Sequence, residues 1–412
     1  MKNIILFVGI LFLVSFLVGC GQKDVDEYYI SNEEFFRGTD GFAMEFRRGV
    51  VPDSLLDDTL FSAVLQLHNK GAYYLNGFIT LIFEKDFICI ADDSGACVEY
   101  NVQQVSGTHL KDQITQKQQR IVTLYKLIDE VHAGRQSGDA SALAAEARTL
   151  RDDIQALKKS VPLTNPFKTK WIGLEGKSFF TPSGEQDEVR YTLKAKTLPS
   201  LKTKHTTQLI ATACYEYATS FTDEVCIDTN VNKLKIFEGT CEAEDVTSSG
   251  QGSPLVVERV EVTMLQDTMD YVRPQFNIHV RNAGKGKVIN AEKVEEACSS
   301  AGLEKRDYNA VFLNTFMLSN AAYSYSFDGY DPNTGKEIVG SYDRDTIECH
   351  PNPLILRKGE DNYFRCAVQR GLSDDAFRTS QASYKTPVQI DLSYGYQFSQ
   401  SVSLDVEKDV VY

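Results

Sequence analysis

The feature that most constrains the fold of this chain is an alternation of apolar and polar residues that occurs twice and leads each time into a similar turn. The first copy alternates Phe61, Ala63, Leu65 and Leu67 with polar residues and leads into Asn69-Lys70-Gly71. The second alternates Phe276, Ile278 and Val280 and leads into Asn282-Ala283-Gly284. Alternation of period two makes a strand with one buried face, and the asparagine and glycine suit the turn that ends it.

A second matched pair of patterns lies further along each copy. The first contains Leu209, Ala211, Ala213, Tyr215 and Tyr217, and then Val225 and Ile227. The second contains Val388, Ile390, Leu392, Tyr394 and Tyr396, and then Leu404 and Val406. We interpret each as a closing hairpin and the whole as two copies of one β domain, 41–244 and 255–412. A small polar linker at 245–254 would join them.

The strand followed by an Asn-x-Gly turn resembles the CARDB-like and related immunoglobulin-like modules of prokaryotic surface proteins. The resemblance covers short segments of each copy, and both copies carry insertions that a minimal module lacks. It implies a mainly β chain with two immunoglobulin-like β-sandwich domains, and a role in adhesion, spacing or partner binding.

The first domain is interrupted by a helical pattern at about 108–160. Apolar residues at helical spacing form two stripes on either side of Gly134 to Gly138. These residues are Leu110, Ile114, Ile121, Leu124, Ile128 and Val131, then Leu143, Leu150, Ile154 and Leu157. They predict an antiparallel helical hairpin, either a strut whose stripes face each other or an arm that docks on a partner coiled coil. A smaller insertion, 291–303, predicts one short helix that carries Cys298.

The N-terminus predicts export. Met1-Lys2-Asn3 precedes an apolar run from Ile4 to Val18, which is typical of a signal peptide, here 1–19. The run ends in Leu17-Val18-Gly19-Cys20-Gly21, which resembles the lipobox of prokaryotic lipoproteins. That resemblance implies lipidation of Cys20, a tether over 20–40, and a chain held on the extracytoplasmic side of the cell membrane. The alternatives are an ordinary cleaved signal and an uncleaved N-terminal helix.

Eight further cysteines remain of the nine in the chain. They are Cys89, Cys97, Cys214, Cys226, Cys241, Cys298, Cys349 and Cys366. An even number in an exported chain predicts disulfides, and no pair has the spacing of zinc ligands. The local pairs Cys89 with Cys97 and Cys214 with Cys226 are expected. Cys349 with Cys366 and Cys241 with Cys298 would then follow.

Charge and motifs exclude several classes of function. The net charge of −14 argues against binding to nucleic acid. The one basic stretch contains Lys194, Lys196, Lys202 and Lys204, which would either guard strand edges or contact an anionic surface polymer. No metalloprotease or nucleophile-elbow motif is present, and Gly176-Lys177-Ser178 lacks the upstream glycine of a phosphate-binding loop, where Trp171 stands. We therefore predict no enzyme, no cofactor and no metal.

Two weaker signals have simple interpretations. His68 and His279 fall on the polar faces of strands, where we expect them to face solvent. The acidic segment Asp328 to Glu337 has oxygen ligands at alternating positions, but it fits a hairpin turn better than a calcium site.

The predicted function is therefore a surface lipoprotein with a structural or protein- or ligand-binding role. Its expected contacts are the membrane, a protein partner and, less directly, a surface polymer. Two alternatives remain: an accessory subunit of a secretion, pilus or transport complex that docks through the helical hairpin, and an envelope enzyme.

Overall fold

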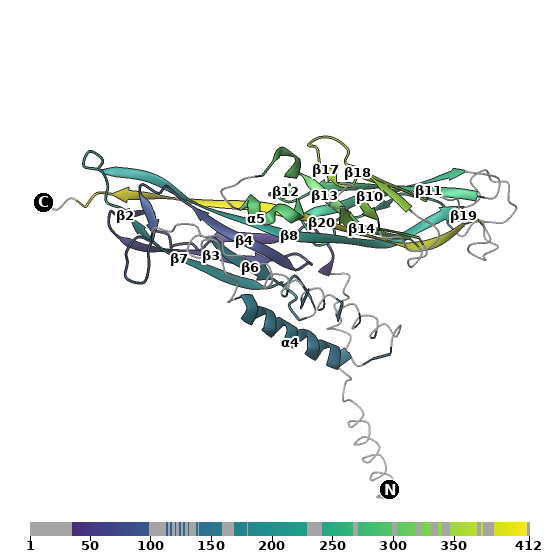
Figure 1. The fold of residues 1–412 in the computed structure, drawn as a ribbon, viewed down its shortest axis with the longest axis horizontal. Helices are drawn as coiled ribbons and strands as arrows, with labels where there is room; N and C mark the ends of the chain where they lie inside the picture. The colour runs from purple at the N-terminus through teal and green to yellow at the C-terminus, as the bar shows by residue number, and fades with distance from the viewer. Residues whose placement is uncertain are drawn as a thin grey trace, which may run out of the picture.

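The protein is mainly β, with several antiparallel sheets (Figure 1). The computed structural model describes residues 35–98, 140–158, 169–178, 180–228, 241–266, 271–298, 303–318, 323–330, 337–339, 347–368, 372–373 and 383–409, with single positions between 113 and 138.

A ten-stranded sheet, called the shared sheet below, runs the length of the molecule. Its central path is β15-β14-β13-β20-β8-β4-β6, while β2 and β12 pair with β20 and β17 pairs with β13. The bounds are β2 Ser54–Leu56, β4 Leu75–Ile82, β6 Thr169–Leu174, β8 Lys204–Asp228, β12 Lys287–Ile289, β13 Ala310–Leu318, β14 Tyr323–Tyr330, β15 Glu337–Val339, β17 Leu354–Ile355 and β20 Ser383–Glu407.

Two smaller sheets accompany it. The first sheet has the order β1-β3-β7-β5, and the second has β16-β18-β11-β10-β9 with β19 paired to β11. The bounds in the first are β1 Phe42–Phe46, β3 Leu60–Asn69, β5 Ile88–Ile90 and β7 Gln186–Ala195. Those in the second are β9 Val246–Thr247, β10 Leu255–Gln266, β11 Tyr271–Asn282, β16 Ile347–His350, β18 Tyr363–Val368 and β19 Leu372–Ser373.

The strands β8 and β20 join the two halves of the molecule. Each is 25 residues long, and they pair antiparallel from Lys204 opposite Glu407 to Asp228 opposite Ser383. The predicted closing hairpins are therefore wrong: residues 218–224 continue the strand, because β20 supplies hydrogen-bonding partners along its whole length. One half of each strand lies over the first sheet and the other half over the second (Figure 1).

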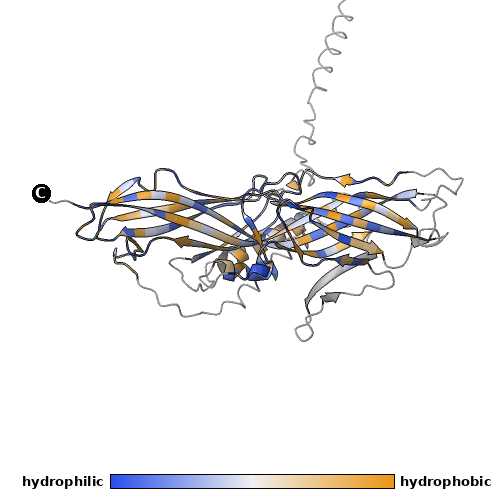
Figure 2. Ribbon diagram, turned by 90° about the horizontal axis from the view of Figure 1, so that it is seen from above, coloured by the Kyte–Doolittle hydropathy of each residue, from blue (hydrophilic) through white to orange (hydrophobic). Residues whose placement is uncertain are grey.

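Both smaller sheets pack on the same face of the shared sheet. The rings of Phe42 and Tyr215 lie 5.3 Å apart in the first half, and those of Phe276 and Phe316 lie 5.1 Å apart in the second. Apolar and polar residues alternate along the strands (Figure 2), so each strand buries one face. The buried apolar residues of both halves form one continuous core, and the apolar area they remove from water is the main source of stability.

A pseudo-twofold axis passes through the pair Glu216 and Gly395 in the middle of the shared sheet. Tyr217 lies opposite Tyr394 there, and Tyr215 lies opposite Tyr396. These four tyrosines are buried on the inner face, and we call them the waist. Burial raises the pKa of each of them.

The two asparagine turns meet the waist in the same way. The hydroxyl of Tyr217 donates to Oδ1 of Asn69 at 3.2 Å, and that of Tyr396 donates to Oδ1 of Asn282 at 3.0 Å. The same oxygen accepts from the main-chain N–H of Gly71 in one turn and of Gly284 in the other. Each turn therefore fixes one smaller sheet to a tyrosine of the shared sheet.

The segment 245–254, predicted as an open linker, is partly built into the fold. β9 pairs with β10, and residues 250–254 are buried. The N–H of Gly252 donates to the carbonyl of Gly38 at 2.8 Å, and Gln251 bonds both main-chain polar groups of Val257. Only the exposed start of this segment, around Ser249, is therefore expected to make few contacts with the rest of the fold.

The helices are short additions to the sheets. α4 spans Ala140–Lys158 and lies beside β6, while most of the predicted first arm of the hairpin falls outside the described residues. In the second half η2 Ala291–Lys293 and α5 Val294–Ala297 lie in the predicted smaller insertion, 291–303, with Cys298 directly after α5, and η3 Lys305–Asp307 follows the insertion. None of the helices in the described part of the chain is long and apolar enough to cross a membrane.

Candidate functional site

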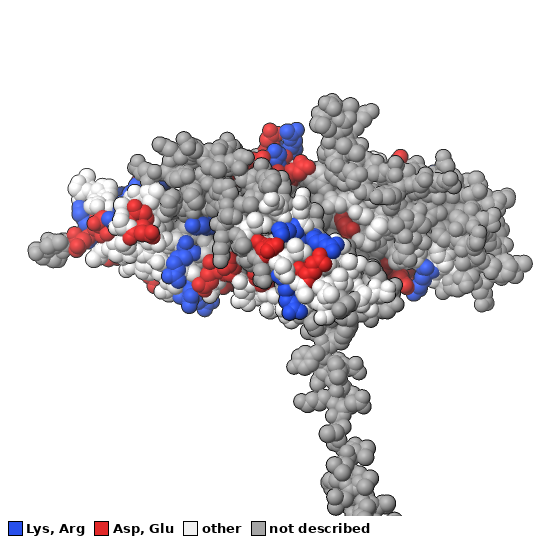
Figure 3. Space-filling view, turned by 60° about the horizontal axis from the view of Figure 1, so that its bottom comes forward, with Lys and Arg blue, Asp and Glu red and all other residues white. Residues whose placement is uncertain are grey.

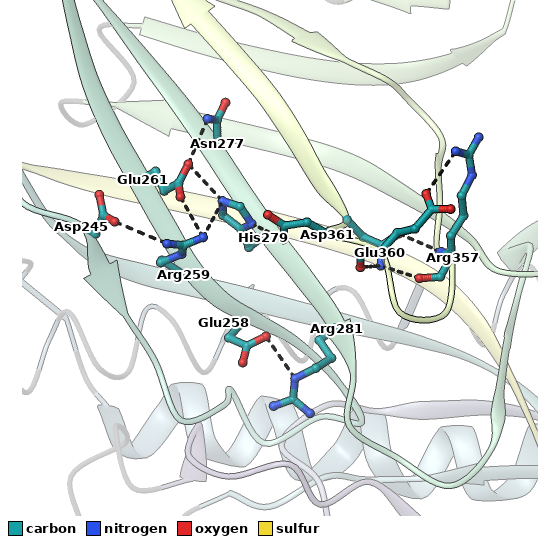
Figure 4. Close-up of polar contacts among 11 residues, drawn as sticks. Asp245, Glu258, Arg259, Glu261, Asn277, His279, Arg281, Arg357, Glu360 and Asp361 are labelled. Atoms are coloured by element: carbon teal, nitrogen blue, oxygen red, sulfur yellow. Dashed lines mark hydrogen bonds and ion pairs between the residues drawn. The ribbon is translucent and has the colours of Figure 1, made fainter.

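A band of interacting polar side chains covers the outer face of the second sheet (Figure 4). Alternation directs Phe276, Ile278 and Val280 of β11 into the core, so the residues between them face outward. A β-bulge between Val257 and Arg259 of β10 adds one residue, and both Glu258 and Arg259 then reach side chains of β11. The outward positions of the two strands supply Glu258, Arg259, Glu261, Asn277, His279 and Arg281.

His279 lies at the centre of this band and is nearly buried, with 7% of its side chain exposed. Its Nδ1 lies 2.8 Å from Oδ1 of Asp361, and its Nε2 lies 3.2 Å from Oε2 of Glu261. Nη2 of Arg259 is 3.4 Å from the same Nε2, and the ring of Tyr363 lies 5.3 Å away. The expectation that His279 faces solvent is wrong, because Asp361 and Tyr363 from the neighbouring β18 region cover its outward side.

Glu261 is held as a carboxylate by three neighbours. The side-chain amide of Asn277 donates to it at 3.1 Å, which lowers the pKa of Glu261, and His279 and Arg259 lower that pKa further. Arg259 binds Oε1 at 2.7 Å and also lies 3.7 Å from a carboxylate oxygen of Asp245. Arg259 therefore lies between two carboxylates, that of Glu261 on its own strand and that of Asp245 just before β9.

The loop that carries Asp361 is fixed independently of His279. The main-chain N–H of Arg357 donates to Oδ1 of Asn362 at 2.7 Å, and Nδ2 of Asn362 donates back to the carbonyls of Arg357 and Glu360. The carbonyl of Asn362 accepts from Val280 of β11 at 2.8 Å. Asp361 is thus presented to His279 by a loop with its own hydrogen bonds.

An open pocket of about 530 Å³ lies beside His279. It is lined by Thr247, Ser248, Glu258, Arg259, His279 and Asp361. The Oγ of Ser248 accepts from the N–H of Gly250 and from Nε2 of Gln251, so this hydroxyl stabilises a turn. Both ring nitrogens of His279 already face charged partners, which suits a charged recognition surface better than proton abstraction from a substrate.

The described surface elsewhere mixes both signs of charge (Figure 3). Of the basic stretch, Lys194 pairs with Asp58 at 2.6 Å and Lys204 pairs with Asp405 and Glu407. β7 lies between β3 and β5, so Lys194 does not guard a sheet edge. Lys194 and Lys204 are therefore used in local ion pairs, each of which contributes little at the surface, while Nζ of Lys202 lies 4.7 Å from the centre of the Phe87 ring.

The eight cysteines form four disulfides, two of them as predicted. Cys89 bonds Cys97, and Cys349 bonds Cys366. The predicted pairs Cys214 with Cys226 and Cys241 with Cys298 are wrong: Cys214 bonds Cys298, and Cys226 bonds Cys241. Twelve residues of extended strand separate Cys214 from Cys226, about 40 Å at the usual rise, so they cannot meet.

The remaining predicted residues are placed as follows. His68 lies on β3, where its Nε2 is 2.7 Å from the carbonyl of Ser183. Cys20 and residues 331–336 of the acidic segment lie outside the described part of the chain. In that described part, no group of three or more His, Cys, Asp or Glu side chains is arranged to hold a metal ion.

Sequence reasoning missed the partners of His279. The alternation of β10 and β11 places Arg259, Glu261 and His279 on outward faces, but only the strand register brings them together. Asp361 comes from a loop about 80 residues further along the chain, for which no local pattern gives a signal. No protein-family model and no curated protein matches this chain.

Proposed function

We propose that this protein is an extracytoplasmic lipoprotein that binds a protein or other ligand at the cell surface. The observation that carries the proposal is the use of the cysteines. Eight of nine form disulfides, which is typical of proteins in an oxidising compartment, and the one left over is Cys20 at the end of the apolar N-terminal run. A cysteine at that position is the one that a lipid anchor needs.

The anchor would hold the chain by its acyl chains, which bury methylene groups in the bilayer at about 0.8 kcal/mol each. Two or more chains give stable attachment without a membrane-spanning helix. Of the predicted tether 20–40, residues 35–40 belong to the folded part, because Phe35 is buried and the carbonyl of Gly38 accepts from Gly252. Residues 20–34 would then connect the lipid to it.

The architecture we propose is a pair of immunoglobulin-like sandwiches fused through β8 and β20. The matched asparagine turns and the shared tyrosine waist support the idea of two copies of one module. Because two 25-residue strands span both halves, the pair would behave as one stiff body rather than two modules on a flexible linker. Such a body suits a role in spacing or display.

The outer face of the second sheet is the surface we favour for binding. It combines a pocket, a nearly buried histidine and charged side chains of both signs, and Tyr363 is 40% exposed beside them. Aromatic and arginine side chains set among charged neighbours are frequent in protein interfaces. The enzyme alternative would need an unpaired acid or base, whereas the groups around His279 are engaged with one another.

Docking through helices is the second candidate. Lys117 and Arg120, which are helical, pair with Asp153 and Glu146 of α4 at 2.6 and 2.9 Å. Leu124 and Ile154 are buried. These contacts favour two helices that satisfy each other as a strut, and they leave the outer side of α4 for a partner.

Two experiments test the proposal. In the native host, Cys20→Ser should move the protein from the membrane fraction to the soluble fraction or leave its signal uncleaved. Mass spectrometry of the mature chain should find lipid on Cys20; a mature N-terminus at another residue would contradict the anchor.

The binding face is tested by charge reversal. Arg281→Glu lies on the proposed face, and its partner Glu258 is half exposed, so the fold should tolerate the change. Arg47→Glu on the first sheet is the matched control, because Arg47 forms a similar exposed pair with Glu188 at 3.1 Å. Proteins that co-purify with the anchored wild type should be lost with Arg281→Glu only. Equal retention by both variants would move the binding site elsewhere, and loss only on deletion of 110–157 would favour the helical candidate.

A further inference from the structure

The contacts of His279 are asymmetric, and the asymmetry separates its two ring nitrogens. Nδ1 faces only a carboxylate, that of Asp361, so it keeps its hydrogen whether the ring is neutral or charged. Nε2 instead faces a donor and an acceptor at once, Arg259 at 3.4 Å and Glu261 at 3.2 Å. The state of this one nitrogen therefore decides which neighbour it can bind.

The two states have different partners. In the neutral ring Nε2 has a lone pair, which accepts a hydrogen bond from the guanidinium of Arg259. In the charged ring Nε2 carries hydrogen, which it donates to Glu261. A charged ring also repels the guanidinium, because two like charges then lie within hydrogen-bonding distance at a nearly buried ring.

Arg259 is the group that is able to move. Asp361 is fixed by the Asn362 loop, and Glu261 is fixed by Asn277. Arg259 is 38% exposed at its side chain, lines the pocket and has a second acid, Asp245, within 3.7 Å. Repulsion from His279 would turn it toward Asp245 and change the shape and charge of the pocket wall.

In the described part of the chain, the charged and titratable groups around the histidine come from β10, β11, β18 and the loop before β18. β10 contributes Arg259 and Glu261, the loop before β18 contributes Asp361, and β18 contributes Tyr363. On β11 itself Arg281 is held by Glu258 at 3.0 Å. Asp245 takes part through its contact with Arg259.

We propose that His279 is a proton-operated switch that sets the position of Arg259 in the pocket of the second sheet. Above the titration of the ring, Arg259 stays against His279 and Glu261; below it, Glu261 binds the imidazolium and Arg259 turns to Asp245. The switch makes binding at this face respond to the pH outside the cell, and this consequence rests on the function proposed above. The change of hydrogen-bonding partner at Nε2 of His279 is independent of that function.

The test is nuclear magnetic resonance of the full mature chain labelled with ¹⁵N at histidine and arginine side chains. Spectra are recorded from about pH 4.5 to about pH 8.5, which brackets ordinary histidine titration. His279→Gln assigns the ring signals, and this change suits the strand because Gln66 occupies the matching position of β3. Nδ1 of His279 should stay protonated throughout, Nε2 should gain hydrogen as the pH falls, and the Arg259 side-chain signals should move with the same midpoint.

Two variants keep the test decisive. In His279→Gln the Arg259 signals should no longer move over this pH range, and in Asp245→Asn their movement should shrink because the second partner has lost its charge. His68, which bonds a main-chain carbonyl, serves as the internal reference. A neutral ring that carries its hydrogen on Nε2, or an Arg259 that does not follow the ring, would overturn the switch while leaving a binding role intact. Retention of the co-purifying proteins by Arg281→Glu, together with the expected spectra, would instead overturn the binding face and leave the switch intact.

Discussion

The two halves of the molecule are alike where they meet and different where they face outward. At the waist, the pairs Asn69 and Asn282, Gly71 and Gly284, and Tyr217 and Tyr396 make the same contacts. On the outer faces, Gln66 of β3 reaches an exposed Glu188 at 3.5 Å, whereas the matching His279 of β11 is nearly buried among three charged side chains, those of Arg259, Glu261 and Asp361.

The physical reason for the likeness is the shared pair of strands. The first and second sheets must both seat on β8 and β20 around one pseudo-twofold axis, so each turn meets the same tyrosine hydroxyl. A side chain on Gly71 or Gly284 would overlap that hydroxyl, which explains why both turns need glycine. The outer faces carry no such constraint, so one half can develop a site that the other lacks.

The largest expected effect comes from the disulfide that ties the inserted helix of the second half to β8. Cys214 and Cys298 are 84 residues apart, and in the chain-entropy picture their bond contributes about 4.6 kcal/mol. Cys349 and Cys366 are 17 residues apart within the second half, where the same reasoning gives about 3 kcal/mol. Urea unfolding of the two Cys→Ala double variants measures both. If removing Cys214 and Cys298 costs less, the insertion is only loosely joined to the rest of the fold.

Substitutions of the two turn asparagines test how far the two halves are equivalent. Asn69 is fully buried, and its amide donates to the carbonyls of Tyr73 and Leu174. Asn282 donates only to the carbonyl of Gly286 and is half buried. We expect Asn69→Ala to cost about 3 kcal/mol and Asn282→Ala about 1.5 kcal/mol, because more buried groups lose their partner in the first half. Equal costs would show that burial does not separate the two turns.

The local parts of this design could be predicted from the sequence, and the distant parts could not. The alternation before Asn69 and Asn282 and two of the disulfides, Cys89 with Cys97 and Cys349 with Cys366, follow from neighbouring residues. The pairing of β8 with β20 does not: after Tyr215 a run of polar residues interrupts the alternation, which looks like a turn unless the partner strand is known. The same limit led to the wrong pairing of Cys214 and to the expectation of a solvent-facing His279.

A smaller effect sharpens the comparison at the waist itself. The hydroxyl of Tyr396 donates to Asn282 and accepts from Gly286, and the hydroxyl of Tyr217 has a matching bond to Asn69. Each Tyr→Phe change removes one buried hydroxyl and should cost about 1.5 kcal/mol. If the two halves are equivalent there, the free energies of unfolding of Tyr217→Phe and Tyr396→Phe should agree to within about 0.5 kcal/mol. A clear difference between the two free energies would show that the two halves are not equivalent at the waist.

The smallest effect distinguishes the halves by their response to acid. Two main-chain N–H groups, of Leu198 and Asp409, lower the pKa of Asp57 in the first half, and Asn277, His279 and Arg259 lower that of Glu261 in the second. A lowered carboxyl pKa means that the folded chain binds this proton more weakly than the unfolded chain does. The stability that each group adds is therefore present above its ordinary value, 3.8 for Asp57 and 4.5 for Glu261, and is lost as the pH falls through the lowered one.

Urea unfolding at a series of pH values from about 6 down to about 3 measures this loss as a slope. Asp57→Asn and Glu261→Gln should each flatten the slope, because each removes one carboxylate whose proton uptake differs between the two states. Added salt separates them: the main contacts of Asp57 are two uncharged N–H groups, with a smaller contribution from Lys408, whereas those of Glu261 include Arg259 and His279. Salt should therefore reduce the contribution of Glu261 more than that of Asp57. The same salt response from both carboxylates would mean that the charged neighbours of Glu261 add nothing to its hydrogen bond with Asn277.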